Sequence, residues 1–242
     1  MKKIKVICID MFQTLVNVYT RKEFIWKRIL GKGYTKELEE KYANLVDKKI
    51  IEKFHEDVSS RNNFINFKMI FLEKFTEVFQ ELKLNLSPME ATKIFIEEHG
   101  FAELYEDSNE FIEIVGKDYP ICLVSDADIE MVRPLLEKFN FDMVFISEQI
   151  KSYKKDKEGT IFKKVLEHYK VEPEEVIHIG DTSSDILGAN RVGITTCWIN
   201  RNNYMWKYEV NPMHEIRTLL EVLPLLDIGY EKLINGEEKD FA

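Results

Sequence analysis

Two aspartates that lie far apart in the sequence each stand directly after a short apolar run. Asp10 follows residues 4–9 (Ile-Lys-Val-Ile-Cys-Ile), and Asp181 follows residues 176–180 (Val-Ile-His-Ile-Gly). Short, largely apolar runs that are rich in β-branched residues are typical of buried parallel strands. The carboxyl ends of such strands meet at one edge of the sheet, where ligands bind in open α/β folds. We therefore predict that the two carboxylates lie together in a binding or catalytic site.

Further polar residues recur in an order that suits attack on a phosphoryl group. A hydroxyl residue ends the apolar run 120–125, a lysine-rich loop follows at 151–157, and a second acid comes four positions after Asp181. Together they would supply a nucleophile, a hydroxyl donor, a cation and metal-binding acids. Each one alone would more often be a helix cap or a solvated side chain, so the prediction rests on the combination. The candidates are Asp10, Thr14, Ser125, Asp126, Lys154, Asp181 and Asp185.

The converging acids imply a cation. Two or three carboxylates in one site repel each other and repel a phosphate dianion unless positive charge lies among them. Magnesium binds oxygen ligands and usually takes one or two carboxylates, with water and substrate oxygens completing its shell. Asp10, Asp181 and the main-chain carbonyl of Phe12 fit that demand. We therefore expect Mg²⁺ as the cofactor.

The apolar runs and the helical patterns between them predict an α/β fold. Five runs, at 4–9, 120–125, 142–146, 176–180 and 194–199, alternate with amphipathic stretches, the last of which predicts a helix near 213–226. Alternation of this kind indicates a parallel sheet with right-handed crossovers. The predicted architecture is a Rossmann-like, three-layer parallel sheet with an inserted all-helical cap.

The cap is predicted from one connection that is far too long. A strand–helix–strand unit needs about thirty residues, whereas Asp10 and Ser125 are separated by most of the first half of the chain. Residues 37–54 and 64–84 have apolar positions at helical spacing, and Ser87-Pro88 has the form of a third helix start. We predict a core domain formed by residues 1–15 and 105–242, and a helical cap domain formed by residues 16–104.

The order of the motifs resembles that of the haloacid dehalogenase superfamily, whose phosphatases carry four such motifs and can insert a helical cap after the first strand. The resemblance covers essentially the whole chain and is most specific over residues 179–189 (Ile-Gly-Asp-Thr-Ser-Ser-Asp-Ile-Leu-Gly-Ala). It implies attack by Asp10, through an aspartyl-phosphate, with Lys154 holding the charges of nucleophile and phosphate together; Lys155 is the alternative lysine.

The resemblance also implies a set of site residues. The catalytic residues would be Asp10, Ser125 and Lys154. The substrate-binding residues would be Thr14, Ser125, Asp126 and Lys154. The metal ligands would be Asp10, the main-chain carbonyl of Phe12, Asp181 and Asp185, the last either as a direct ligand or as an acid that supports the ligands.

The chain departs from the family pattern next to the nucleophile. Family phosphatases usually place a second aspartate, the general acid and base, two residues after the first, whereas this chain has Phe12 followed by Gln13. Loss of a positioned acid typically costs about 10²–10⁴ in rate. Superfamily dehalogenases carry an aromatic residue there, because a halide needs no proton, but they lack the metal. Asp126, Asp128 or a cap residue is the alternative proton source.

Three functions are compatible with these features. The first is a magnesium-dependent hydrolase of a small phosphorylated metabolite, with a good leaving group as the best match. The second is a haloacid dehalogenase-like hydrolase acting at carbon, and the third is a non-catalytic member of the fold that binds a ligand or a protein. The sequence names neither the substrate nor the oligomeric state.

Composition excludes some partners. The net charge of −9 over 242 residues would repel nucleic acid and anionic membranes. There is no apolar stretch long enough to span a bilayer, and the three cysteines lie in apolar runs, which predicts reduced core residues of a cytoplasmic protein. The histidines and tryptophans are interpreted as packing residues.

Overall fold

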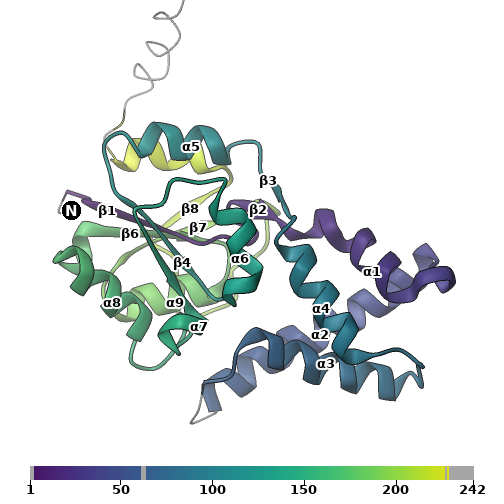
Figure 1. Cartoon of the computed structure of the whole chain (residues 1–242). Coiled ribbons are helices and arrows are strands. Elements are labelled where there is room, and N and C mark those ends of the chain that lie inside the picture. Colours follow the sequence, from purple (N-terminus) through teal and green to yellow (C-terminus); the bar gives the residue numbers. More distant parts are fainter. Residues whose placement is uncertain (1–2, 61–63, 227, 229–242) are drawn as a thin grey trace, which may run out of the picture.

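The computed structural model describes residues 3–60, 64–226 and 228, and it contains a six-stranded parallel sheet (Figure 1). The strand order is β5-β4-β1-β6-β7-β8, so β1 is a central strand with β4 on one side and β6 on the other. The strands are β1 (Val6–Ile9), β4 (Ile121–Ser125), β5 (Met143–Ile146), β6 (Val176–Gly180), β7 (Thr195–Ile199) and β8 (His214–Ile216). This sheet confirms the predicted α/β fold class.

Helices cover both faces of the sheet because its central strands are apolar on both sides. Ile7 and Ile9 pack into the core cluster that includes Phe111 of α5, whereas Val6 and Cys8 pack against the cluster beneath α8 and α9. This alternation makes three layers. The flanking helices are α5 (Ser108–Val115), α6 (Ile129–Leu136), α7 (Ser147–Ile150), α8 (Thr160–Tyr169) and α9 (Ser183–Arg191), with a 3-10 turn η3 (Pro173–Glu175).

The prediction of an α-helix near 213–226 is wrong. Residues His214–Ile216 form β8, which pairs with β7, and Leu219–Leu226 form a 3-10 helix, η4. Pro224 lies inside η4 and lacks the N–H that a regular α-helix would use. The apolar spacing was compatible with a helix, but the edge of β7 offered backbone partners that a local pattern does not reveal.

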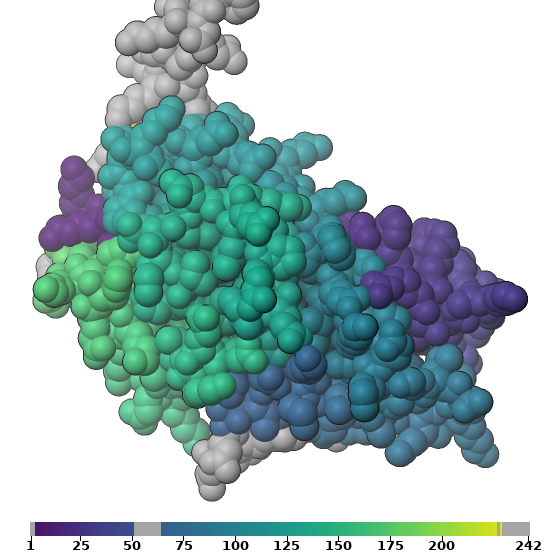
Figure 2. All heavy atoms as spheres, in the orientation of Figure 1, coloured from purple at the N-terminus to yellow at the C-terminus, as the bar shows by residue number. Residues whose placement is uncertain are grey.

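Four long helices form a separate body beside the sheet (Figures 1 and 2). Trp26, Phe75 and Val78 belong to a hydrophobic cluster formed largely within this body. Ser87 caps the fourth helix through its hydroxyl, as its sequence predicts. The helices are α1 (Lys22–Leu30), α2 (Lys36–Ser60), α3 (Phe67–Glu81) and α4 (Pro88–His99), with 3-10 turns η1 (Val18–Arg21) and η2 (Gly31–Gly33). Among the described residues, no helix combines the length and apolar character needed to cross a bilayer.

A short antiparallel pair joins the helical body to the sheet. Strand β2 (Val16–Asn17) pairs with β3 (Glu103–Leu104), at the two positions between which the sequence predicts the cap. The chain therefore leaves and re-enters the core side by side. We keep residues 16–104 as the proposed limits of the cap.

A buried carboxylate fastens the cap to the core. Asp128, which precedes α6, accepts hydrogen bonds from the backbone N–H groups of Phe67 (2.9 Å) and Lys68 (2.8 Å), the first residues of α3. Glu148 supports the same junction, because it accepts from the Asn66 side chain (3.0 Å) and from the backbone of Ile129 (2.8 Å). The first N–H groups of a helix have no partner within the helix, so an anion there is stabilising.

Replacing this carboxylate should loosen the junction. We expect Asp128→Ala to lower the free energy of unfolding by about 1–2 kcal/mol and to speed amide hydrogen exchange at Phe67 and Lys68. Glu130→Ala is the control, because Glu130 makes an exposed ion pair with Lys68 (3.0 Å) that contributes less than about 1 kcal/mol. Equal effects of the two substitutions would contradict the assignment of Asp128 as a fastening residue.

Candidate active site

The sheet brings the predicted acids together at its carboxyl edge. Asp10 directly follows β1, Ser125 ends β4 and Asp181 follows β6, and these three strands are neighbours. The backbone N–H of Asp10 donates to the carbonyl of Ile179 (2.9 Å), which continues the β1–β6 ladder up to the carboxylate. The Ser125 hydroxyl donates to Asp10 Oδ1 (2.9 Å). Asp10 therefore stands where the strand order reverses, the usual ligand-binding point of such sheets.

Lys154 is the cation that meets Asp10. Its Nζ lies 2.9 Å from Asp10 Oδ1 and 2.5 Å from Asp185 Oδ1, and its side chain is almost fully buried. Lys155 instead places its Nζ over the ring of Tyr208. Burial by itself would lower the pKa of Lys154, but the carboxylates of Asp10 and Asp185 outweigh burial and raise that pKa. Lys154 is therefore a permanent positive charge between two acids.

Asp185 is fully engaged by neighbouring groups. Oδ1 accepts from Lys154 and from His178 Nε2 (2.8 Å), and Oδ2 accepts from the backbone N–H (3.0 Å) and hydroxyl (2.6 Å) of Thr182. Burial would raise the pKa of Asp185, but Lys154 and His178 lower it, so it is ionised. A carboxylate has about four lone-pair sites, and all four are used here. This arrangement favours Asp185 as the acid that positions Lys154 over Asp185 as a direct metal ligand.

His178 is a site residue that the sequence interpretation missed. It was assigned to packing because it lies in a buried strand, yet its ring reaches Asp185. Because an ionised carboxylate only accepts hydrogen bonds, Nε2 carries the proton. The available signal was its position two residues before Gly180, on the same side of β6.

Two glycines allow this packing. A Cβ on Gly180 would lie 2.1 Å from Asp185 Cγ, and a Cβ on Gly188 would lie 2.1 Å from the carbonyl oxygen of Lys154. Any side chain at position 180 would displace the carboxylate, and any at 188 would push α9 away from the lysine loop. The glycines of the 179–189 motif therefore determine where Asp185 and Lys154 can sit.

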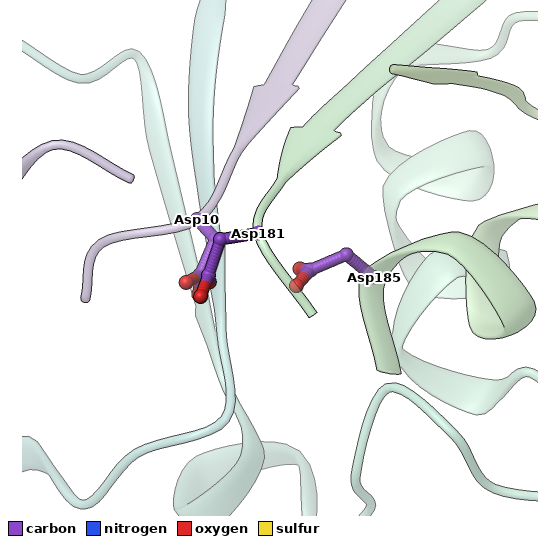
Figure 3. Close-up of side chains that lie close together, drawn as sticks. All are labelled: Asp10, Asp181 and Asp185. Atoms are coloured by element: carbon purple, nitrogen blue, oxygen red, sulfur yellow. The ribbon is translucent and has the colours of Figure 1, made fainter. Parts of the chain in front are cut away.

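Asp10, Asp181 and Asp185 form a compact acidic cluster (Figure 3). Each offers one carboxylate oxygen, and these oxygens all lie within 4.8 Å of one another. In Figure 3 Asp185 points toward the other two from the start of α9. Burial, followed by repulsion from Asp185 and Asp10, raises the pKa of Asp181, and burial also raises the pKa of Asp10 although Lys154 opposes it. Asp181 Oδ1 is buried and has no hydrogen-bond partner among the described residues. An oxygen-rich, buried site of this kind fits a small divalent cation.

A cleft of about 720 Å³ opens onto these acids. Its polar floor is formed by Asp10, Asp126, Lys154, Asp181, Thr182, Ser183 and Ser184, and Ile50 and Phe67 reach it from the cap. Thr14 is fully buried and is absent from the cleft lining among the described residues, so its position does not favour substrate contact. Ser125 is also buried, and it reaches the site through Asp10.

Phe12 lies in the cleft where the family acid would stand. Its ring meets His99 of the cap edge-on, with centroids 5.4 Å apart. Burial lowers the pKa of His99 to about 4, so its ring is neutral at pH 7. The carboxylate of Asp128, one of the alternative acids, already accepts hydrogen bonds from the first backbone N–H groups of α3. Asp126 differs, because burial raises its pKa to about 7 and its Oδ2 is buried without a partner among the described residues.

Comparison with known proteins identifies the class of this chain. A family model of haloacid dehalogenase-like hydrolases matches residues 4–193, so the chain belongs to this family and is a hydrolase of the haloacid dehalogenase superfamily. This confirms the resemblance inferred from the motifs.

Curated relatives include enzymes of both chemistries. The chain is 30% identical over 128 residues to (S)-2-haloacid dehalogenase 4A of Burkholderia cepacia, which covers 50% of this chain and 54% of that protein. It is 32% identical over 89 residues to pyrimidine 5′-nucleotidase PynA of Streptococcus pneumoniae, covering 36% of this chain and 37% of that protein. The chain thus matches about half of the first relative and little more than a third of the second.

Solved structures share the fold. The putative hydrolase YfnB of Bacillus subtilis, solved bound to magnesium, superposes with a TM-score of 0.78 at 18% identity, covering 94% of this chain and all of that one. At this identity the likeness establishes the fold alone.

The raised pKa of the Asp126 carboxyl, whose Oδ2 is buried, predicts a pH-dependent stability. Its pKa is about 7 in the folded protein and about 3.9 when unfolded. Between these values the unfolded chain releases the proton that the folded chain retains, so stability falls as pH rises. Asp126→Asn keeps an acceptor for the Lys154 N–H (2.8 Å) and removes this penalty. We expect urea unfolding in EDTA to give the variant a higher free energy of unfolding than the unmodified protein at pH 8, by at most about 4 kcal/mol. At pH 4 the two free energies should be similar. The same difference at both pH values would refute this.

Proposed function

We propose that this chain is a magnesium-dependent phosphomonoester hydrolase that acts through an aspartyl-phosphate on Asp10. The observation that carries the proposal is the position of the Asp10 carboxylate, which is held on one oxygen by Ser125 and Lys154 and lies beside Asp181. Among the described hydrogen bonds none involves Asp10 Oδ2, which leaves that oxygen for the metal or the substrate. Small phosphorylated metabolites are the proposed substrates.

Each residue would have a defined part in the reaction. Asp10 attacks phosphorus while the bond to the ester oxygen breaks, and the leaving group departs with that electron pair. Lys154 and Ser125 orient Asp10, and the positive charge of Lys154 offsets the negative charge that gathers on the transferring phosphoryl group. Water then hydrolyses the aspartyl-phosphate, which returns free Asp10 and inorganic phosphate.

Asp10, Asp181 and the main-chain carbonyl of Phe12 would hold the magnesium ion. The support is the donor set itself, namely the clustered carboxylate oxygens and the unpartnered Asp181 Oδ1. Bound Mg²⁺ would offset the mutual repulsion of these acids and of the phosphate dianion. Asp185, whose oxygens are already engaged, would keep Lys154 in place.

A dehalogenase-like reaction at carbon is the second candidate, and Phe12 is the observation that favours it. The acidic cluster with its unpartnered Asp181 Oδ1 argues for the phosphatase, because an attack at carbon needs no metal. Chelation discriminates between the two, since a dehalogenase would stay active in EDTA. Ligand binding without turnover of any phosphoester or haloacid would indicate a non-catalytic member.

The negative net charge disfavours nucleic-acid and membrane partners, and the three buried free cysteines support a reducing, cytoplasmic setting.

Removing the nucleophile tests the proposal directly. Asp10→Asn retains an oxygen for Ser125 and Lys154 but cannot attack phosphorus, so we expect kcat to fall by more than about 10³-fold with an unchanged circular dichroism spectrum. Asp142→Asn, at an exposed position at the opposite edge of the sheet, is the matched control and should keep full activity. Substantial phosphatase activity in Asp10→Asn would rule out aspartyl catalysis.

Phe12 predicts which phosphoesters react fastest. Without an acid at this position the rate should rise steeply as the pKa of the leaving group falls. Phe12→Asp, with Gln13→Gly to free the turn, should raise alkyl phosphate hydrolysis, by at most about 10²–10⁴-fold. The measurement is kcat/KM over a series of alkyl and aryl phosphates for both proteins. A flat series in the unmodified protein, lost in Asp126→Asn, would instead make Asp126 the proton donor.

A further inference from the structure

The core contributes to the cleft a wall that is built largely of aromatic rings. Trp198 lies in β7, one residue before its end, and Tyr204, Trp206 and Tyr208 belong to the connection between β7 and β8; all four line the cleft. Tyr204 is 67% exposed and its neighbour Met205 is 81% exposed. Large apolar side chains that gather around a cleft mark a binding surface. The sequence interpretation assigned the tryptophans to packing. Packing accounts for the buried Trp198, but it does not account for the exposed rings of Tyr204 and Tyr208.

Three of the rings contact one another in series, starting at the carboxyl edge of the sheet. Trp198 Nε1 donates to the carbonyl of Asp181 (2.8 Å), so the first ring is tied to a proposed metal ligand. Trp206 contacts Trp198 with centroids 4.9 Å apart, and Tyr208 contacts Trp206 at 5.1 Å. A continuous series of ring contacts therefore connects Asp181 to Tyr208.

Polar contacts hold this wall in shape without a ligand. The Asn200 side chain bonds both backbone groups of Tyr204, accepting from its N–H (2.8 Å) and donating to its carbonyl (2.9 Å). Trp206 Nε1 donates to the carbonyl of Val210 (2.9 Å). Arg201 fastens the start of the connection to Asp107 through two hydrogen bonds (2.8 and 3.0 Å). A preorganised surface loses little conformational entropy when a ligand packs on it.

We propose that this wall selects phosphomonoesters that carry a planar aromatic ring, which packs against Trp206 and Tyr204 while the phosphate meets Asp10. The proposal rests on the function proposed above and names its substrate class. A cleft of about 720 Å³ holds a ring as well as a phosphate. Aromatic rings prefer offset or edge-on contacts with one another, a preference that a saturated ring of similar size does not share.

Binding to the Asp10→Asn variant tests the proposal without turnover. Titration calorimetry in magnesium chloride would compare two matched pairs: phenyl phosphate against cyclohexyl phosphate, and uridine 5′-monophosphate against ribose 5-phosphate. We expect the aromatic member of at least one pair to bind about 10-fold more tightly. In Trp206→Leu, added to Asp10→Asn, that ratio should fall to about 2-fold or less.

Two further variants keep the test decisive. Tyr204→Leu changes an exposed ring and should lower the ratio even if Trp206→Leu does not fold. Phe24→Leu replaces a 51% exposed ring on α1 that is outside the described cleft lining, and it should leave the ratio unchanged. No aromatic preference in either pair, or a preference that survives both wall substitutions, would overturn the proposal. Hydrolysis of phosphomonoesters with no aromatic preference in binding would overturn it while leaving the phosphatase function intact; aromatic binding without hydrolysis would do the reverse.

Discussion

One buried ion cluster organises this protein. Asp10, Asp181 and Asp185 approach within 4.8 Å of one another, and Lys154 is held between two of them. At 4 Å a pair of unit charges interacts by about 4 kcal/mol at the effective dielectric constant typical of proteins, and one ammonium group cannot balance the charge of three ionised acids. Lys154 offsets the charges of Asp10 and Asp185, and the proposed Mg²⁺ would offset the charge of Asp181.

The residues around Lys154 fix its position in the site. Asp185 is held by His178 and Thr182, and all four of its lone-pair sites are used. Gly180 makes room for the carboxylate, and Gly188 lets α9 approach the Lys154 backbone. The two acids of this motif therefore differ in their contacts. Asp181 Oδ1 has no hydrogen-bond partner among the described residues, whereas both oxygens of Asp185 are engaged.

The two walls of the cleft have different origins. The cap contributes Ile50 and Phe67, and its approach depends on the Asp128 carboxylate at the start of α3. The aromatic wall comes from the core, where the connection between β7 and β8 is pinned by Asn200 and Arg201.

The sequence alone was sufficient to predict the sheet, the inserted helices and the family. Buried parallel strands are continuous apolar runs, so Asp10 and Asp181 could be placed at strand ends by local pattern, and the overlong first connection indicated the cap. The roles of the site residues and the limits of the cap domain stay predictions.

Other features were decided by tertiary structure. Residues 214–216 became a strand because β7 offered an edge, and Lys154 was distinguished from Lys155 by contact with Asp10. His178, Asp128 and Trp206 took on their contacts with residues distant in the sequence or in separate elements, and such contacts leave no periodic signal in the chain. Spacing along a chain predicts which face a residue occupies, but only the packing of elements determines which charges and rings meet there.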